Sequence, residues 1–270
     1  MTSGHASNRD WHPGFNYPDD VFILNDKGEI EVKTQDGLIR GKVNSQNPKV
    51  YYAPGNCRIA QIKSPNEAIV LSWLQSGGVT QYFGYLIDTW HGVSGWGMAQ
   101  HLLASDRPTF FEAHHMNCLA IQFLQEQIAD YRVRNNLGKG EEEYGKVYDK
   151  NIFVGYGDPA LEVRIGKSTE PFYEKEMKIE EVRETKYNLK VKIIRDNTSL
   201  STPIVFLLPK KAVSPRVTGA PNFSYKIGDN FAILDVGHDI FNENNAPRLR
   251  PRELKKGSEW TLEFYTKPGN

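Results

Sequence analysis

Cysteine is scarce in this sequence, neither sign of charge is in excess, and no apolar run is long. The 270 residues include two cysteines, Cys57 and Cys118, which excludes a framework of several disulfides and leaves at most one bridge. Lys and Arg number 33 and so do Asp and Glu, so net charge gives no reason to expect nucleic acid or an acidic membrane surface as a partner. No apolar run approaches the length of a membrane span, and the first residues lack the pattern of a signal peptide. The composition instead predicts a soluble globular protein.

Residues 49–86 carry the pattern of a strand, a helix and a second strand. Lys49–Ala53 is a β-branched and aromatic run that stops at Pro54-Gly55. Ser64-Pro65-Asn66-Glu67 has the spacing of a capping box with proline in the first turn, and predicts a helix to about Gln75. Val79–Leu86 predicts the next strand. This order is typical of a βαβ unit, so we expect the two strands to be parallel.

The rest of the first half mixes short strands with helices. Before residue 49, hairpin strands are expected at Val21–Leu24, Glu29–Lys33 and Leu38–Gly41. Thr109 and Glu112 form a second capping box, which predicts a long helix to about Arg134. A charged loop over Asn135–Gly145 and a strand over Lys150–Tyr156 are expected to follow.

The pattern changes near residues 168–171, after which apolar and polar residues alternate. Leu189, Val191 and Ile193 alternate with lysines, and Trp260, Leu262 and Phe264 alternate with Thr261 and Glu263. About six or seven such strands with polar turns predict a β-sandwich over residues 171–270. The sequence thus predicts two domains, an α/β domain over 1–167 and this sandwich.

Cys57 follows a predicted strand, and His5 precedes it near the start of the chain. A thiol attacks as its thiolate, and a nearby imidazole can accept the proton. A Gly-Asn-Cys turn at the end of a parallel strand exposes the sulfur together with a backbone N–H that is able to stabilise an oxyanion. The alternatives are plain: a cysteine at a strand end is often a small core residue, and a histidine near a terminus is often inert.

Four motifs in the same order resemble the gingipain-type cysteine peptidases, within the group that shares the caspase-like fold. Gly4-His5-Ala6-Ser7 with Trp11 resembles the family's catalytic histidine motif, and Gly55-Asn56-Cys57 resembles its nucleophile turn. Trp90 falls where the family has a tryptophan that lines the primary specificity pocket. Tyr156–Leu161 matches the Tyr-Gly-Asp-Pro-x-Leu motif that ends the peptidase domain, after which the family has an immunoglobulin-like domain. The likeness covers residues 1–165 well and the remainder only in kind.

The resemblance implies a cysteine endopeptidase that forms a thioester on Cys57 with His5 as its base and then its acid. It implies that the N–H groups of Cys57 and Ala6 hold the oxyanion, although Ala6 stands where the family usually has glycine. It places Trp90, Thr89 and Asn56 at the substrate pocket. The partner would be a protein or peptide substrate, no cofactor or metal is expected, and the family is largely exported to the cell envelope or beyond.

The family also implies strands before the histidine, so we expect a caspase-like domain that is incomplete at its N-terminus and needs an upstream segment. The main alternative is a non-catalytic pseudo-peptidase whose β-sandwich binds a ligand. A gene fragment with no fold of its own is the third possibility. His114 and His115 are adjacent on a predicted helix and point in different directions, which disfavours a zinc pair.

Overall fold

The computed structural model describes residues 6–11, 20–34, 36–89, 92–137, 141–167, 171–181, 183–196, 198–243 and 246–267, without the side chains of 141–144, 243 and 246. Contacts divide the chain into two compact units. The first unit is Met1–Trp96 with Tyr148–Val163, and the second is Gly97–Val147 with Arg164–Asn270. The predicted boundary near residues 167–171 stays a prediction, whereas the contacts group the long helix with the C-terminal strands.

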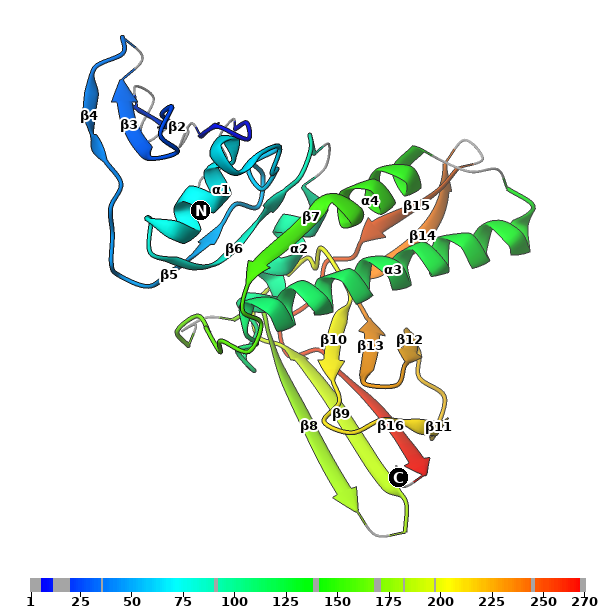
Figure 1. Ribbon diagram of the computed structural model, residues 1–270. Coiled ribbons are helices and arrows are strands. Elements are labelled where there is room, and N and C mark those ends of the chain that lie inside the picture. Colours follow the sequence, from blue (N-terminus) through cyan, green and yellow to red (C-terminus); the bar gives the residue numbers. More distant parts are fainter. Residues whose placement is uncertain are drawn as a thin grey trace. The chain divides into compact units, whose positions relative to one another are not determined.

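The first unit begins with a four-stranded antiparallel meander, seen in blue in Figure 1. Its strands are β1 (Asp10–Trp11), β2 (Asp20–Leu24), β3 (Ile30–Thr34) and β4 (Ile39–Lys42). The three hairpin strands expected from the sequence are therefore confirmed. Leu24 and Ile30 flank the β2–β3 turn and are buried in the core of this unit.

A second sheet of the first unit contains β5 (Lys49–Tyr52), β6 (Val79–Tyr85) and β7 (Phe153–Gly157). As expected from the βαβ pattern, β5 and β6 are parallel, with Tyr51 opposite Tyr82. In contrast, β7 is antiparallel to β6, because the residue before it is already fixed beside the end of β6 by a hydrogen bond from Leu86 N–H to Ile152 O (2.9 Å). A chain that enters at that end must run back along β6.

The predicted caspase-like parallel sheet is therefore wrong. The described residues form five small sheets, and β5–β6 is the parallel pair among them. The strands before β5 form an antiparallel meander instead of further parallel strands, because the segments between them are too short for crossover helices.

The helix predicted from Ser64 is interrupted at its start. A 3₁₀ turn, η1 (Pro65–Glu67), precedes α1 (Ile69–Gln75), and the Ser64 side chain makes no cap hydrogen bond. The first helical N–H, that of Ile69, donates instead to Asn8 O at 2.9 Å, and Asn8 Nδ2 donates to Glu67 O at 2.6 Å. The segment that contains Asn8 thus supplies hydrogen bonds at the start of this helix, where the sequence predicted a cap from the Ser64 side chain.

Three further helices connect β6 to β7: α2 (Val93–Leu102), α3 (Phe110–Asn135) and α4 (Glu141–Ile152). The capping box at the start of α3 is confirmed, since Glu112 N–H donates to Thr109 Oγ1 (3.1 Å) and Thr109 N–H donates to Glu112 Oε2 (2.6 Å). The loop expected over Asn135–Gly145 is wrong in its second part, where α4 begins. Among the described residues, no helix is long and apolar enough to cross a membrane.

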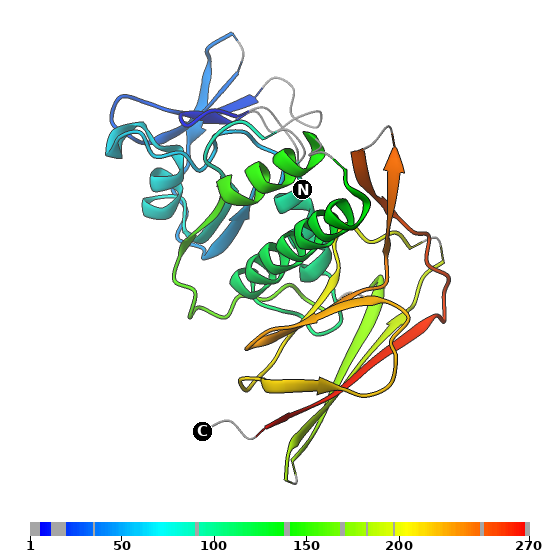
Figure 2. The same ribbon diagram turned by 90° about the vertical axis from the view of Figure 1, so that its right-hand side faces the viewer.

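The second unit contains two antiparallel sheets and a hairpin. Figure 2 shows the long red strand β16 beside the yellow-green strand β9. One sheet has the order β11-β16-β9-β8, the other has the order β10-β13-β12, and β14 pairs with β15. The strands are β8 (Tyr173–Glu181), β9 (Thr185–Ile193), β10 (Ile204–Leu207), β11 (Val213–Val217), β12 (Ser224–Ile227), β13 (Phe231–Asp235), β14 (His238–Glu243), β15 (Ala246–Pro251) and β16 (Glu259–Lys267).

The two sheets of the second unit share one apolar core. Leu189 and Val191 of β9 belong to the same buried cluster as Ile204 of β10 and Leu234 of β13. On the other face of β10 and β13, Val205 and Ile233 pack with Met116, Ala120 and Phe123 of α3. This alternation buries both faces of the small sheet. The two sheets agree with the β-rich tail expected from the sequence. The likeness to an immunoglobulin domain stays a prediction.

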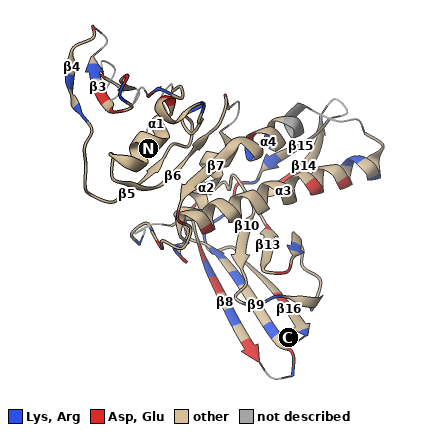
Figure 3. Ribbon diagram, viewed as in Figure 1, with Lys and Arg blue, Asp and Glu red and all other residues tan. Residues whose placement is uncertain are grey.

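The outward face of the larger sheet is highly charged. Figure 3 shows basic and acidic residues interspersed along β8, and basic residues along β9. Lys190 and Lys192 of β9 pair with Glu259 of β16, and Lys186 pairs with Glu263. The charges of this face are therefore largely balanced across strands, as expected for a solvated sheet surface.

Candidate functional site

The predicted nucleophile lies where the two parallel strands of the first unit end. Tyr52 of β5 is opposite Phe83 of β6, so the turn after β5 and the loop after β6 leave the sheet at the same edge. In sheets with parallel strands this edge commonly holds the ligand or the reacting groups. The described segments concerned are residues 54–58, 86–89 and 92–95, which we call the strand-end site.

Hydrogen bonds hold the chain on both sides of Cys57 against β6 and β7. They are Ala53 N–H to Phe83 O (3.0 Å), Arg58 N–H to Ile87 O (3.3 Å), Ala60 N–H to Tyr85 O (3.0 Å), Tyr82 O–H to Ile59 O (3.1 Å) and Tyr156 O–H to Ala60 O (3.0 Å). Gly84 permits this close approach, because a Cβ there would lie 2.5 Å from the Ile59 side chain. Cys57 is half-buried, so this fixed framework holds a cysteine that is partly exposed.

The neighbours of Cys57 have distinct environments. Asn56 is 1% exposed and lies beside the Tyr51 hydroxyl. Burial raises the pKa of Tyr51, and the nearby Tyr82 and Asn56 side chains partly offset that rise. Arg58 has a left-handed backbone (φ +55°), which is uncommon for a residue with a side chain and is concentrated at turns and functional sites. Its exposed guanidinium pairs with Asp88, which raises the pKa of Arg58.

The loop after β6 is anchored by the buried carboxylate of Asp149 in α4. Asp149 Oδ2 accepts the Ser94 N–H (2.7 Å) and the Tyr85 hydroxyl (3.1 Å), and Oδ1 accepts the Thr89 hydroxyl. Thr89 Oγ1 also accepts the N–H of Gly92 at 3.1 Å. Burial, with the Asp149 carboxylate as a second cause, raises the pKa of Tyr85, so this phenol stays protonated and remains a donor.

The anchored loop touches the turn that carries Cys57. Tyr52 O–H donates to Gly95 O, and the Tyr85 hydroxyl accepts Gly95 N–H at 3.0 Å. A Cβ on Gly95 would lie 2.1 Å from Pro54 O, so only glycine fits where the first turn of α2 meets the turn after β5. The geometry of the Cys57 turn therefore depends on a loop some 40 residues later in the chain.

The structure locates four of the six predicted site residues. Cys57, Asn56 and Thr89 belong to the strand-end site as described. Ala6 is 3% exposed and lies in the same buried cluster as Ala53 and Ile59, which flank the Cys57 turn.

His5 and Trp90 lie outside the described residues, so the predicted dyad and pocket wall stay predictions. The hydroxyl of Thr89 forms hydrogen bonds that hold the loop, with the Asp149 carboxylate and the Gly92 N–H.

Sequence reasoning gave no role to Asp149, because that segment was expected to be a loop followed by a strand. The described buried positions of α4 are Gly145, Asp149 and Ile152, at the i, i+4, i+7 spacing of a helix face. Two of these three residues are not apolar, which hides the helical pattern. The available signal was Asp149 at the central position of this face, because a carboxylate on a buried helix face indicates an acceptor for hydrogen bonds from other segments.

Among the described residues, no group of three or more His, Cys, Asp or Glu side chains is placed to hold a metal ion. Neither Cys57 nor Cys118 forms a disulfide. Comparisons with protein-family models, with curated proteins and with solved structures found no match.

Proposed function

We propose that this protein is a cysteine-type endopeptidase with Cys57 as its nucleophile. The observation that carries the proposal is the placement of Cys57, half-buried on a turn fixed by hydrogen bonds, at the carboxyl edge of a parallel strand pair. A nucleophile must be held in a fixed position and be accessible to the substrate, and a half-buried residue on this turn meets both requirements. The motif resemblance adds His5 as the base, and the burial of Ala6 beside residues that flank the turn supports that partner.

The reaction follows from the chemistry of a thiol and an imidazole. His5 accepts the thiol proton, and the Cys57 thiolate attacks the carbonyl carbon of a peptide bond. The N–H groups of Cys57 and Ala6 stabilise the negative oxygen of the tetrahedral intermediate. The C–N bond breaks and His5 returns the proton to the leaving amine. Water, deprotonated by His5, then hydrolyses the thioester, which releases the carboxylic acid and restores the thiol.

Site-resolved labelling tests this proposal. The chain, and a version extended upstream, would be treated with peptide chloromethyl and acyloxymethyl ketones, and the adducts located by mass spectrometry. We expect labelling of Cys57 that is abolished by His5→Ala and unchanged by Cys118→Ser. Peptidase activity that survives Cys57→Ala would overturn the proposal.

The second candidate is a non-catalytic binding protein. The finding that favours it is the five-sheet architecture, which replaces the caspase-like sheet expected of an active family member. Failure of every ketone to label Cys57, in both chain lengths and in protein shown to be folded by circular dichroism, would decide for this candidate.

A further inference from the structure

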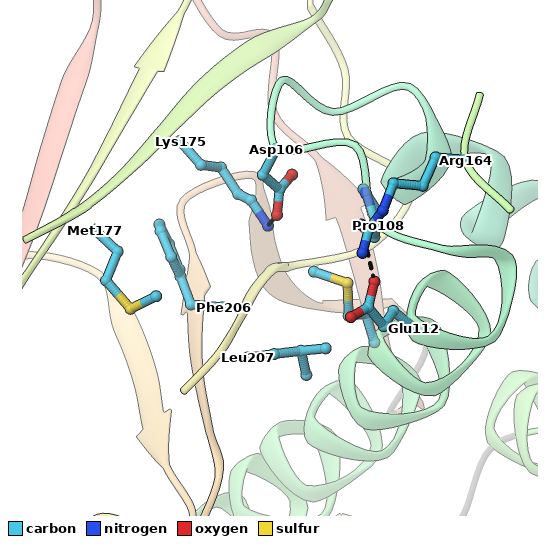
Figure 4. A pocket seen from close by; sticks show the side chains of 9 residues that line it. Asp106, Pro108, Glu112, Arg164, Lys175, Met177, Phe206 and Leu207 are labelled. Carbon is cyan, nitrogen blue, oxygen red and sulfur yellow. Dashed lines mark hydrogen bonds and ion pairs between the residues drawn. The ribbon is translucent and has the colours of Figure 1, made fainter. Parts of the chain in front are cut away.

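A cavity of about 210 Å³ in the second unit combines buried charge with apolar walls. It is lined by Asp106, Pro108, Glu112, Met116, Arg164, Lys175, Met177, Phe206 and Leu207. These residues come from the segment before α3, the first turns of α3, the segment before β8, β8 itself and β10. Figure 4 shows the two ion pairs of this cavity near each other, with Met177, Phe206 and Leu207 around the remaining space.

Lys175 is the most unusual residue of this cavity, because its side chain is only 2% exposed. Its Nζ lies 2.6 Å from Asp106 Oδ2 and donates to Val205 O at 2.8 Å. An ammonium group has three N–H donors, so these two hydrogen bonds leave one, and Nζ also lies 5.1 Å from the centroid of the Phe206 ring. Burial lowers the pKa of Lys175, against the opposing effect of Asp106, and a second negative group would favour its charged form.

The second ion pair joins Arg164 to Glu112, with Arg164 Nη1 at 3.3 Å from Glu112 Oε2. Arg164 Nη1 also donates to Arg107 O at 2.6 Å, which fixes the guanidinium at the cavity wall. The Glu112 and Asp106 side chains are 41% and 38% exposed, so both keep access to a ligand. The lining therefore carries two positive and two negative groups and has no net charge.

Charge, polarity and volume together define a ligand class. A ligand with one net charge would leave an unbalanced charge in a partly buried space, which is costly. A dipolar ligand complements both signs at once, and the Met177, Phe206 and Leu207 side chains suit an apolar tail. The volume lies below the roughly 300 to 1,000 Å³ of pockets for drug-sized ligands, so the ligand is small.

We propose that this cavity binds a hydrophobic α-amino acid as its zwitterion, with the carboxylate at Lys175 and Arg164, the ammonium at Asp106 and Glu112, and the side chain against Phe206 and Leu207. This site is separate from Cys57 and does not depend on the proposed peptidase activity.

Calorimetric titration of the full chain tests the proposal with leucine and two analogues, 3-methylbutylamine and 4-methylpentanoate. Each analogue lacks one charged group and keeps the side chain. We expect leucine to bind, and each analogue to bind at least about tenfold more weakly, as follows from the loss of hydrogen bonds to charged groups. Glycine, which lacks the apolar side chain, is also expected to bind more weakly.

Variants test whether leucine binds in this cavity. Asp106→Asn preserves the shape of a partly exposed side chain and is expected to weaken leucine binding about tenfold. Lys175→Met is expected to abolish it. The matched control is Lys178→Met, on the same strand and also paired with an acid (3.1 Å to Glu176), but 66% exposed and outside the cavity. This control is expected to bind leucine like the unchanged protein.

Equal binding of leucine and both analogues would overturn the proposal, as would the absence of leucine binding up to about 10 mM, beyond the millimolar range. Unchanged leucine affinity in Asp106→Asn, shown to be folded by circular dichroism, would also overturn it. The Asp106→Asn result keeps the test decisive if Lys175→Met fails to fold.

Discussion

Asp149 and Ser94 join α4 to the first turn of α2, since the Asp149 carboxylate accepts the Ser94 N–H at 2.7 Å. Asp149 is completely buried, and the same carboxylate accepts the hydroxyls of Tyr85 and Thr89. A buried charge is tolerated in a protein when donors surround it. These contacts fix the loop that packs on the Cys57 turn.

Replacing this carboxylate therefore tests how the loop is held. Asp149→Ala leaves three donors without their acceptor, and we expect the free energy of unfolding to fall by about 2 to 5 kcal/mol. Urea unfolding measures the change, and hydrogen exchange of residues 86–89 and 92–95 is expected to accelerate. Asp130→Ala, on the exposed surface of α3, is the control. A loss no larger than that of the control would contradict the role of Asp149.

Gly95 gives a steric test of the contact between the loop and the Cys57 turn. Gly95→Ala places a Cβ against Pro54 O, and the displacement is expected to cost about 1 to 3 kcal/mol despite the better helix propensity of alanine. If the peptidase proposal is correct, ketone labelling of Cys57 also slows. Gly41→Ala has nothing within 4 Å of the new Cβ and is the matched control. Equal stability of the two variants would show that the turn adapts freely.

The two capping-box sequences differ in the structure and are expected to differ in energy. Thr109→Ala removes a side-chain cap that is present, at a cost of about 1 kcal/mol. Ser64→Ala removes no cap hydrogen bond, so we expect a change within about 0.5 kcal/mol. Chemical unfolding of both variants checks the difference. A larger loss for Ser64→Ala would mean that the local capping box forms after all.

His101 makes the protein sensitive to acid. It is fully buried, and burial, with the Lys175 charge as a second cause, lowers the pKa of His101 to about 3. Between pH 6.5 and 3 the unfolded chain binds a proton that the folded chain does not. The free energy of unfolding therefore falls as pH falls through this range, by about 1.4 kcal/mol per pH unit from this residue.

Urea unfolding at several pH values measures this slope. His101→Gln is expected to remove its share of the slope, whereas His115→Gln, on the exposed face of α3, serves as the control. An unchanged slope in His101→Gln would show that this histidine titrates alike in the folded and unfolded chain.

Local pattern in the sequence was enough for many elements of the fold. The alternation of Leu189, Val191 and Ile193 marked β9, because side chains of a strand point to opposite faces and one face is buried. Thr109 and Glu112 marked the start of α3, because both capping groups lie within one helical turn. The parallel pairing of β5 and β6 followed from their short helical crossover. Each of these features rests on residues close together in the chain.

Only tertiary structure decided the features that join distant residues. The start of β7 beside the end of β6 set its direction and excluded the caspase-like sheet. Asn8 took the capping place expected for Ser64, and Asp149 became the acceptor for a loop more than fifty residues before it. The cavity around Lys175 is assembled from segments near residues 106–116, 164, 175 and 206. Local propensity carries no information about which of many buried polar groups meet, because that choice depends on how the whole chain packs.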